Sequence, residues 1–142
     1  MTAGVAGHVD PTRERFDAFK ALPRDTPILM LNLIRLREVA AYPDGHSATG
    51  REAYADYGRE SLPVFKRVGG SIVWRGRPEE VVIGPSEERW DIAFVARYPS
   101  AAAFLEMVTD PDYKAAVVHR QAAVDDSRLI RMGELPLTDA FA

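Results

Sequence analysis

One stretch, residues 27–36, constrains the fold of this chain more than any other. It reads Pro-Ile-Leu-Met-Leu-Asn-Leu-Ile-Arg-Leu, an almost unbroken apolar run that begins with a proline and is interrupted by Asn32. A strand with one face in the core alternates apolar and polar side chains, whereas here neighbours that point to opposite faces are both apolar. The run therefore predicts a central β-strand with both of its faces covered.

Composition limits the classes of protein to consider. The 142 residues are about the length of one domain, and 46% hydrophobic with 27% charged residues is typical of a soluble globular chain. A net charge of −3 provides no basic surplus, so we expect neither nucleic acid nor a membrane surface as a partner. The absence of cysteine excludes disulfides, thiolate metal sites and a cysteine nucleophile. Residues 1–7 lack a signal-peptide pattern, and no run approaches the ~20 residues of a membrane helix, so we expect a cytoplasmic protein.

Two helices are predicted from capping motifs that mark where each helix begins. Asp10 and Pro11 form an N-cap and first-turn pair, and the helix that they start should end before Pro23. Its apolar face carries Phe16, Phe19 and Leu22. A second helix should begin at the capping box of Thr49 and Glu52, in which each side chain satisfies a free backbone N–H.

The second helix has a longer apolar face. That face follows a three-and-four spacing through Tyr54, Tyr57, Ser61, Phe65 and Val68. Pro63 removes one backbone donor, so we expect a kink there. Gly69-Gly70 should end the helix, because glycine adopts the left-handed conformation that closes helices.

The rest of the chain predicts strands and a broken helix. Residues 71–75 and 80–83 are extended runs separated by Gly-Arg-Pro-Glu, a spacing that favours a β-hairpin. Residues 90–98 alternate as a strand should, with Trp90, Ile92, Phe94, Ala96 and Tyr98 on the more apolar side.

Ser100 is the expected N-cap of the next helix. Asp110-Pro111 repeats the cap-and-proline signal, so the helix should break there and restart to about Ala123. A short final strand is expected at residues 128–132.

The order of these elements defines a topology. Without the first helix and the hairpin extension it is βαββαβ, the ferredoxin-like α+β arrangement with a four-stranded antiparallel sheet. Right-handed crossovers place both helices on one face, with the first and third strands in the middle. We therefore expect a single domain made of an N-terminal helical extension (1–26), a ferredoxin-like core (27–132) and a C-terminal tail (133–142).

The second face of the sheet needs a cover that one chain does not supply. Depending on the register, about half of the apolar side chains of Leu29, Leu31, Leu33, Ile92 and Phe94 would lie there and leave a larger apolar patch than soluble monomers tolerate. The simplest cover is a second copy, packed sheet to sheet about a two-fold axis. The chain is thus expected to be its own partner in a homodimer.

An ordered set of short motifs resembles a known family. The motifs are Met30-Leu31-Asn32-Leu33, Arg51-Glu52-Ala53-Tyr54, Gly69-Gly70, Trp90-Asp91, Tyr98-Pro99-Ser100, Asp110-Pro111-Asp112-Tyr113 and His119-Arg120. Over residues 27–132 the chain resembles the domain of unknown function 1330 family, within the dimeric α/β-barrel superfamily. The resemblance implies the fold and dimerisation. The superfamily includes cofactor-free monooxygenases, lactone isomerases and haem-binding enzymes, with pockets between helices and sheet, and their activities carry over by analogy of fold alone.

Three polar residues are the first candidates for a site. Asn32 lies in a buried strand, where its amide either orients a ligand carbonyl or hydroxyl or bonds a neighbouring loop or helix end. His119 and Arg120 are candidate catalytic residues, because imidazole titrates near neutrality and guanidinium binds carboxylates in a fork. Adjacent helical positions diverge by ~100°, so the two cannot both point into one pocket. The alternative is a surface histidine and an ion pair of Arg120 with Asp91 or Asp125.

Aromatic residues are the second group of candidates. Tyr54, Tyr57, Trp74 and Trp90 could line a ligand pocket between helix and sheet, with Asp91 at its border, or they could be plain core. The histidines have no metal-ligand spacing, so no metal site is expected, and no cofactor is expected either. Two functions remain open: a cofactor-independent enzyme or binder of a small, aromatic or carboxylated metabolite, and a non-catalytic structural or interaction dimer.

Overall fold

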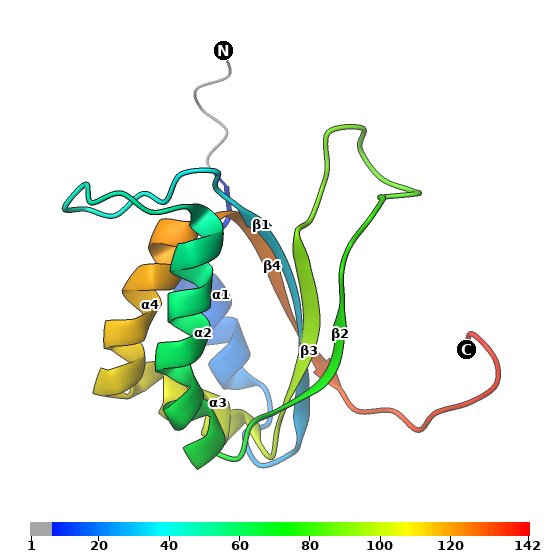
Figure 1. Ribbon diagram of the computed structural model, residues 1–142. Helices are drawn as coiled ribbons and strands as arrows, with labels where there is room; N and C mark the ends of the chain where they lie inside the picture. The colour runs from blue at the N-terminus through cyan, green and yellow to red at the C-terminus, as the bar shows by residue number, and fades with distance from the viewer. Residues whose placement is uncertain (1–6) are drawn as a thin grey trace.

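Four strands of the described chain form one antiparallel sheet, and helices cover one of its faces (Figure 1). The computed structural model describes residues 7–142. Residues 1–6, which entered the prediction that the chain lacks a signal peptide, lie outside this range. The strands are β1 (Ile28–Leu36), β2 (Ser71–Gly76), β3 (Ile92–Tyr98) and β4 (Val124–Gly133). The helices are α1 (Arg13–Ala21), α2 (Gly50–Arg67), α3 (Ala101–Thr109) and α4 (Pro111–Ala123).

The sheet order is β2-β3-β1-β4, so the two most apolar strands lie in its middle, as predicted. β1 pairs antiparallel with β3 on one side, with Met30 opposite Ala96, and with β4 on the other side. Together with α2 and the α3–α4 pair, this is the ferredoxin-like βαββαβ topology. No helix among residues 7–142 is long and apolar enough to cross a membrane.

The core lies between the helices and the sheet. Ile28 and Met30 of β1 pack with Val64 of α2, Tyr98 of β3 and Phe104 of α3. Burial of each large apolar side chain contributes roughly 1.5–3 kcal/mol. Because side chains alternate along a strand, this contact places the even-numbered positions of β1 on the face toward the helices.

The capping box of α2 forms as predicted. Thr49 Oγ1 accepts a hydrogen bond from the Glu52 N–H at 3.0 Å, and Glu52 Oε1 accepts one from the Thr49 N–H at 2.8 Å. The helix continues through Pro63 and is closed by Gly69, whose φ of +87° lies in the left-handed region.

The start of α1 differs from the prediction. Thr12, not Asp10, is the N-cap, and its hydroxyl accepts a hydrogen bond from the Arg15 N–H at 3.1 Å. Both residues can cap, and the one that does so is set by where the chain meets the rest of the fold. None of the residues of α1 is fully buried; its main anchor is Phe19, whose ring lies 5.1 Å from that of Phe104.

The predicted hairpin after β2 is wrong. Residues 80–83 form no strand, and β2 pairs directly with β3 across a long loop, residues 77–91. β2 pairs with β3 instead, and residues 80–83 stay in the loop although the outer edge of β2 is unpaired among the described residues, which shows that strand propensity depends on context. Val82 and Ile83 are 87% and 94% exposed. β3 also begins two residues later than predicted, and β4 begins four residues earlier, directly after α4.

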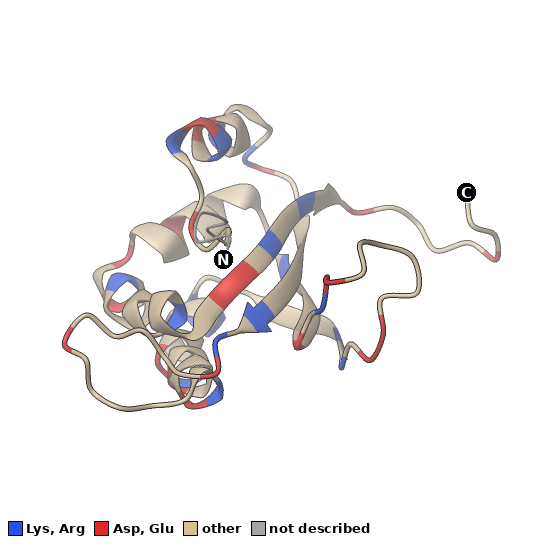
Figure 2. Ribbon diagram, turned by 90° about the horizontal axis from the view of Figure 1, so that it is seen from above, with Lys and Arg blue, Asp and Glu red and all other residues tan. Residues whose placement is uncertain are grey.

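Two rows of side chains run across the sheet, one on the side that faces the helices and one on the opposite side. On the helix-facing side, Asn32 of β1 lies between Phe94 of β3 and Leu129 of β4. One residue along, the side away from the helices carries an apolar row of Trp74, Val95, Leu31 and Ile130. In both ribbon views the C-terminal end of the chain lies on the side of the sheet opposite the helices (Figures 1 and 2).

Candidate functional site

A large open cavity separates the helices from the sheet. Its volume is about 2260 Å³, above the roughly 300–1,000 Å³ of ordinary small-molecule sites. Side chains of α2 and α4 form one wall, those of β1, β3 and β4 form the opposite wall, and α1 with residues 8–12 borders the cavity beside β4. The residues of most chemical interest are Asn32, Tyr54, Tyr57, Phe94, Tyr113 and Arg120.

Three tyrosines line the helical wall. The hydroxyls of Tyr57 on α2 and Tyr113 on α4 lie 2.8 Å apart, and their rings meet edge to face at 6.0 Å. Tyr54 lies one turn earlier on α2, with its ring centroid 5.5 Å from that of Tyr57. Tyr54 and Tyr57 were site candidates from the sequence. Tyr113 was not named as a site candidate, although it lies two helical turns before Arg120 on the same helix.

The tyrosines are neutral at physiological pH. Burial raises the pKa of Tyr54, of Tyr57 and of Tyr113 above the usual value near 10. The positive charge of Arg120 acts in the opposite direction on the pKa of each phenol, so the guanidinium lies within electrostatic reach of all three. This wall therefore offers phenolic hydroxyls for hydrogen bonds rather than phenolates.

Arg120 is half-buried and bonded only to neutral acceptors. Its Nη1 donates to the backbone carbonyl of Val9, and its Nη2 donates to Ser127 Oγ at 3.3 Å. Within residues 7–142 no carboxylate lies within 4 Å of the guanidinium. Guanidinium has five N–H donors, so three remain for another acceptor.

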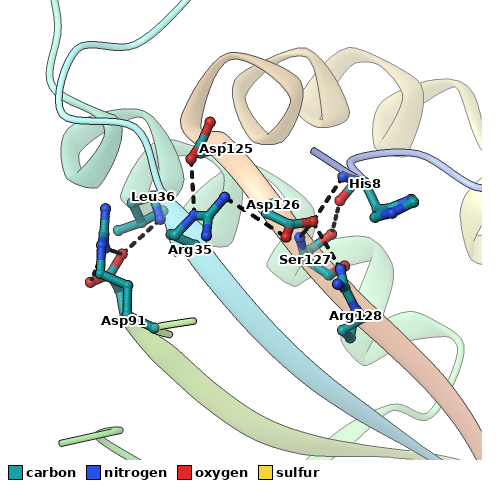
Figure 3. A network of polar contacts seen from close by, with 9 residues as sticks. His8, Arg35, Leu36, Asp91, Asp125, Asp126, Ser127 and Arg128 are labelled. Atoms are coloured by element: carbon teal, nitrogen blue, oxygen red, sulfur yellow. Dashed lines mark hydrogen bonds and ion pairs between the residues drawn. The ribbon is translucent and has the colours of Figure 1, made fainter. Parts of the chain in front are cut away.

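A polar network holds the N-terminal segment, residues 7–12, against β4 (Figure 3). Ser127 Oγ donates to the His8 carbonyl at 2.6 Å, and the His8 N–H donates to Asp126 Oδ1 at 2.8 Å. Burial alone would raise the pKa of Asp126, but the hydrogen bonds from His8 and Arg128 outweigh it, so this pKa is lowered. The network thereby fixes both Ser127 and Val9, the two acceptors of Arg120.

The same network continues across the end of the sheet (Figure 3). Arg35 Nε donates to Asp125 Oδ2 at 2.9 Å, and its Nη2 lies 3.8 Å from Asp126. A register shift in the β1–β4 pairing at this point lets both neighbouring aspartates face one arginine. Asp91, predicted at the border of the site, accepts the Leu36 N–H at 2.8 Å and pairs with Arg89, so it ties the end of β1 to β3.

Asn32 faces the cavity from the sheet. Its Nδ2 donates to the carbonyl of Met30 in its own strand at 3.1 Å, which is its one hydrogen bond to the described residues. The bond to a neighbouring loop or helix end that the sequence left open is not formed. The amide oxygen and one N–H therefore stay available in the cavity.

His119 lies away from the cavity. Its Nδ1 lies 2.6 Å from the hydroxyl of Tyr42, and its Nε2 lies 2.9 Å from Glu60 Oε2. In the tautomer that carries its proton on Nε2, Nε2–H donates to Glu60 and Nδ1 accepts the Tyr42 hydroxyl proton. The structure therefore does not bring His119 and Arg120 together: Arg120 lines the cavity, whereas His119 joins α4 to α2 and the loop after β1.

The two tryptophans do not line the cavity either. Trp74 lies opposite Val95, on the side of the sheet away from the helices, and is 54% exposed. Trp90 precedes β3, and the guanidinium carbon of Arg128 lies 5.3 Å from its ring centroid. Of the aromatic residues predicted for the pocket, the structure places Tyr54 and Tyr57 there.

The topology and the sheet order make this chain an α+β protein of the ferredoxin-like class. It belongs to the family described as domain of unknown function (DUF1330), whose model matches residues 46–133. The sequence motifs indicated this family from residue 27 onward, so the match confirms the family but leaves β1 outside the matched range.

Two solved structures are similar over nearly the whole chain. One is the RPA0582 protein of unknown function from Rhodopseudomonas palustris, with 60% identity, coverage of 92% of this chain and 99% of that chain, and a TM-score of 0.88. The other is a methylated RPA0582 protein, with 59% identity, coverage of 93% and 98%, and a TM-score of 0.91. No protein of curated function matches the chain.

Proposed function

We propose that this protein binds a small organic molecule in the cavity between its helices and its sheet. The observation that carries the proposal is the joint presence of Tyr57, Tyr113 and Arg120 on one wall, with donors left over for a ligand. Ligand sites combine mostly apolar walls with a few convergent polar groups, and this wall has that composition. Asn32 supplies one further amide from the opposite wall.

Binding is favoured over turnover by the position of the titratable groups. The tyrosines have raised pKa values, so they stay protonated at neutral pH and are not available as general bases. His119, the candidate general acid–base residue, is engaged with Tyr42 and Glu60 outside the cavity. A cofactor-independent reaction would therefore have to depend on orientation and on hydrogen bonds from Arg120 and the tyrosines.

A homodimer is the second part of the proposal. The apolar row Trp74, Val95, Leu31 and Ile130 lies on the uncovered side of the sheet, and Trp74 and Ile130 are 54% and 46% exposed. Packing this row against its copy in a second protomer would remove it from water on both chains. The same row also supports the alternative function, a structural dimer without a ligand.

Thermal unfolding in the presence of a small-metabolite library tests the binding proposal. A ligand at a hundred times its Kd should stabilise the folded state by ~2.7 kcal/mol, which is readily measured as a rise in Tm. The variant Tyr113→Leu should lose most of that rise, whereas Val118→Leu on the exposed side of α4 should keep it. If no compound stabilises the wild-type protein while sedimentation shows a stable dimer, the structural alternative is the better description.

A further inference from the structure

Positive charge is concentrated on the helix–sheet cavity of a chain that is acidic as a whole. The net charge is −3, yet the cavity is lined by eight arginines and three acidic residues. The arginines are Arg13, Arg15, Arg51, Arg75, Arg77, Arg120, Arg128 and Arg131, and the acids are Asp10, Glu14 and Asp91. The remainder of the protein is correspondingly more negative. A cavity lined mainly by one sign of charge raises the local concentration of ions of the opposite sign.

Most of these arginines lack an acidic partner. Among residues 7–142, only Arg77 and Arg128 of the eight have a carboxylate within 4 Å. Outside the cavity the pattern is reversed, and five of seven arginines are paired; those five are Arg35, Arg59, Arg67, Arg89 and Arg97. Five of the eight are solvent-exposed, namely Arg13, Arg15, Arg51, Arg75 and Arg77. The half-buried positive charge that no carboxylate of residues 7–142 neutralises is therefore that of Arg120 and Arg131.

Arg120 is the arginine best placed to hold an anion. It is half-buried beside the tyrosines, and its neutral acceptors, the Val9 carbonyl and Ser127 Oγ, orient the guanidinium without neutralising it. A partly desolvated charge without a counter-ion is unfavourable, so an anion that enters is favoured both by charge and by the three unused N–H donors. The fork geometry suits a planar carboxylate.

The neighbouring tyrosines add a second donor. Tyr57 and Tyr113 hold two hydroxyl protons, and their mutual hydrogen bond uses one of them. The other proton is available to an acceptor in the cavity. Beyond these groups the cavity is lined by apolar side chains such as Met30, Phe94 and Val117, which fit an uncharged body.

We propose that the ligand is a small organic carboxylate with an apolar or aromatic body, and that Arg120 binds its carboxylate while the Tyr57–Tyr113 pair donates a further hydrogen bond. This inference rests on the proposed function, because it names the class of molecule that the cavity holds. Arg131, also half-buried, donates to the carbonyls of Phe19 and Pro23, so Arg120 is the guanidinium that lies beside the tyrosines. One guanidinium there favours a monoanion over a phosphate, which is typically held by several backbone N–H groups or by a cluster of charges.

A matched pair of fluorescent probes tests the inference on the full chain. The probes 1-anilinonaphthalene-8-sulfonate and N-phenyl-1-naphthylamine share one aromatic body and differ in the oxyanion. The anionic probe should bind the wild-type protein more tightly than the neutral one. Arg120→Met should raise the Kd of the anionic probe at least about tenfold and leave that of the neutral probe unchanged. The Kd of the anionic probe for Arg120→Lys should lie between its values for the wild type and for Arg120→Met, because lysine keeps the charge but loses the fork.

Two controls make the outcomes distinct. Arg37→Met, at an exposed position outside the cavity lining, should change neither Kd, and circular dichroism should show each variant folded. The carboxylate 4-phenylbutyrate should displace the anionic probe, whereas 4-phenylbutyramide at the same concentration should not. Equal binding of both probes with no effect of Arg120→Met, or equal displacement by acid and amide, would overturn the carboxylate inference and leave cavity binding intact. Binding of neither probe would overturn the proposed function itself.

Discussion

The hydroxyl of Tyr57 on α2 lies 2.8 Å from the hydroxyl of Tyr113 on α4. This bond joins the two helices across the wall of the cavity, between residues 56 positions apart in sequence. The pair therefore links the stability of the helical layer to the shape of the cavity. Its contribution to each can be measured separately, because phenylalanine removes the hydroxyl and keeps the ring.

A double-mutant cycle on this pair should show strong coupling. Tyr57→Phe and Tyr113→Phe should each lower the free energy of unfolding by about 1 kcal/mol, since each removes the same hydrogen bond. The double variant should cost little more than either single one, with a coupling energy of about 0.5–1.5 kcal/mol. Urea denaturation measures all four proteins. Strictly additive losses would mean that the two hydroxyls do not interact in solution.

In an alkaline titration of the folded protein, no tyrosine should ionise at the usual pKa near 10. The chain has five, and the pKa of every one is raised, chiefly by burial. Because the folded pKa exceeds the unfolded value of about 10, the stability that these groups contribute is complete below pH ~10 and is lost as the pH rises above it. Phenolate absorbance should stay low until the protein unfolds, whereas all five should titrate near pH 10 in denaturant. A folded protein that ionises three or more tyrosines near pH 10 would contradict the buried wall, because only two of the five lie outside it.

Asp126→Asn should weaken the attachment of residues 7–12 to β4 and reduce the loss of stability at acid pH. The pKa of Asp126 is lowered by the His8 N–H and Arg128 against the opposing effect of burial. Its contribution to stability is present above the unfolded pKa of about 3.9 and is lost as the pH falls through the lower folded value. The variant should be about 1 kcal/mol less stable at pH 7, and its stability should fall less between pH 5 and pH 2 than that of the wild type. Asp25→Asn, at an exposed position, is the control. If stability falls equally with pH in both variants, Asp126 does not have the role in the network that is described here.

Leu31→Glu should produce a folded monomer. Leu31 lies at the centre of the apolar row on the uncovered side of the sheet, so a charge there would be buried without a partner in the proposed dimer. Analytical ultracentrifugation should give a particle of 15.7 kDa for this variant and twice that mass for the wild type. Val118→Glu, on the exposed side of α4, should remain dimeric. A wild-type protein that sediments as a monomer at micromolar concentration would rule out the dimer.

Elements with strong local signals could be predicted from the sequence. The apolar run gave β1, the Thr49–Glu52 pair gave the start of α2, and Asp110-Pro111 gave the break between α3 and α4. In each case residues within four positions of one another determine the backbone, so no knowledge of the fold is needed. Which face of β1 meets the helices stayed open, because both faces of the run are apolar.

Features that depend on distant contacts could not be predicted. Residues 80–83 have strand-forming side chains, but the fold pairs β2 with the more distant β3 and leaves these residues in the loop between the two strands. Trp74 would share a face with Ile72 by simple alternation, but the register shift between them turns it to the opposite side of the sheet. Of the candidate site residues, Tyr54 and Tyr57 were placed on the inward face of their helix by its spacing, and the structure has them with Arg120 along the cavity. The role of Val9 and Ser127 could not be foreseen, because these residues meet Arg120 only after the chain has folded.

The junction of α4 and β4 restricts how the cavity can change size. Ala123 ends the helix and Val124 begins the strand, with no loop between them. Arg120 and Ser127 therefore belong to one continuous, jointless piece of backbone, and neither can move outward without pulling on the pairing of β4 with β1. The pairing of β4 with β1 thus sets the distance between the helical wall and this part of the sheet, and a ligand has to match that width.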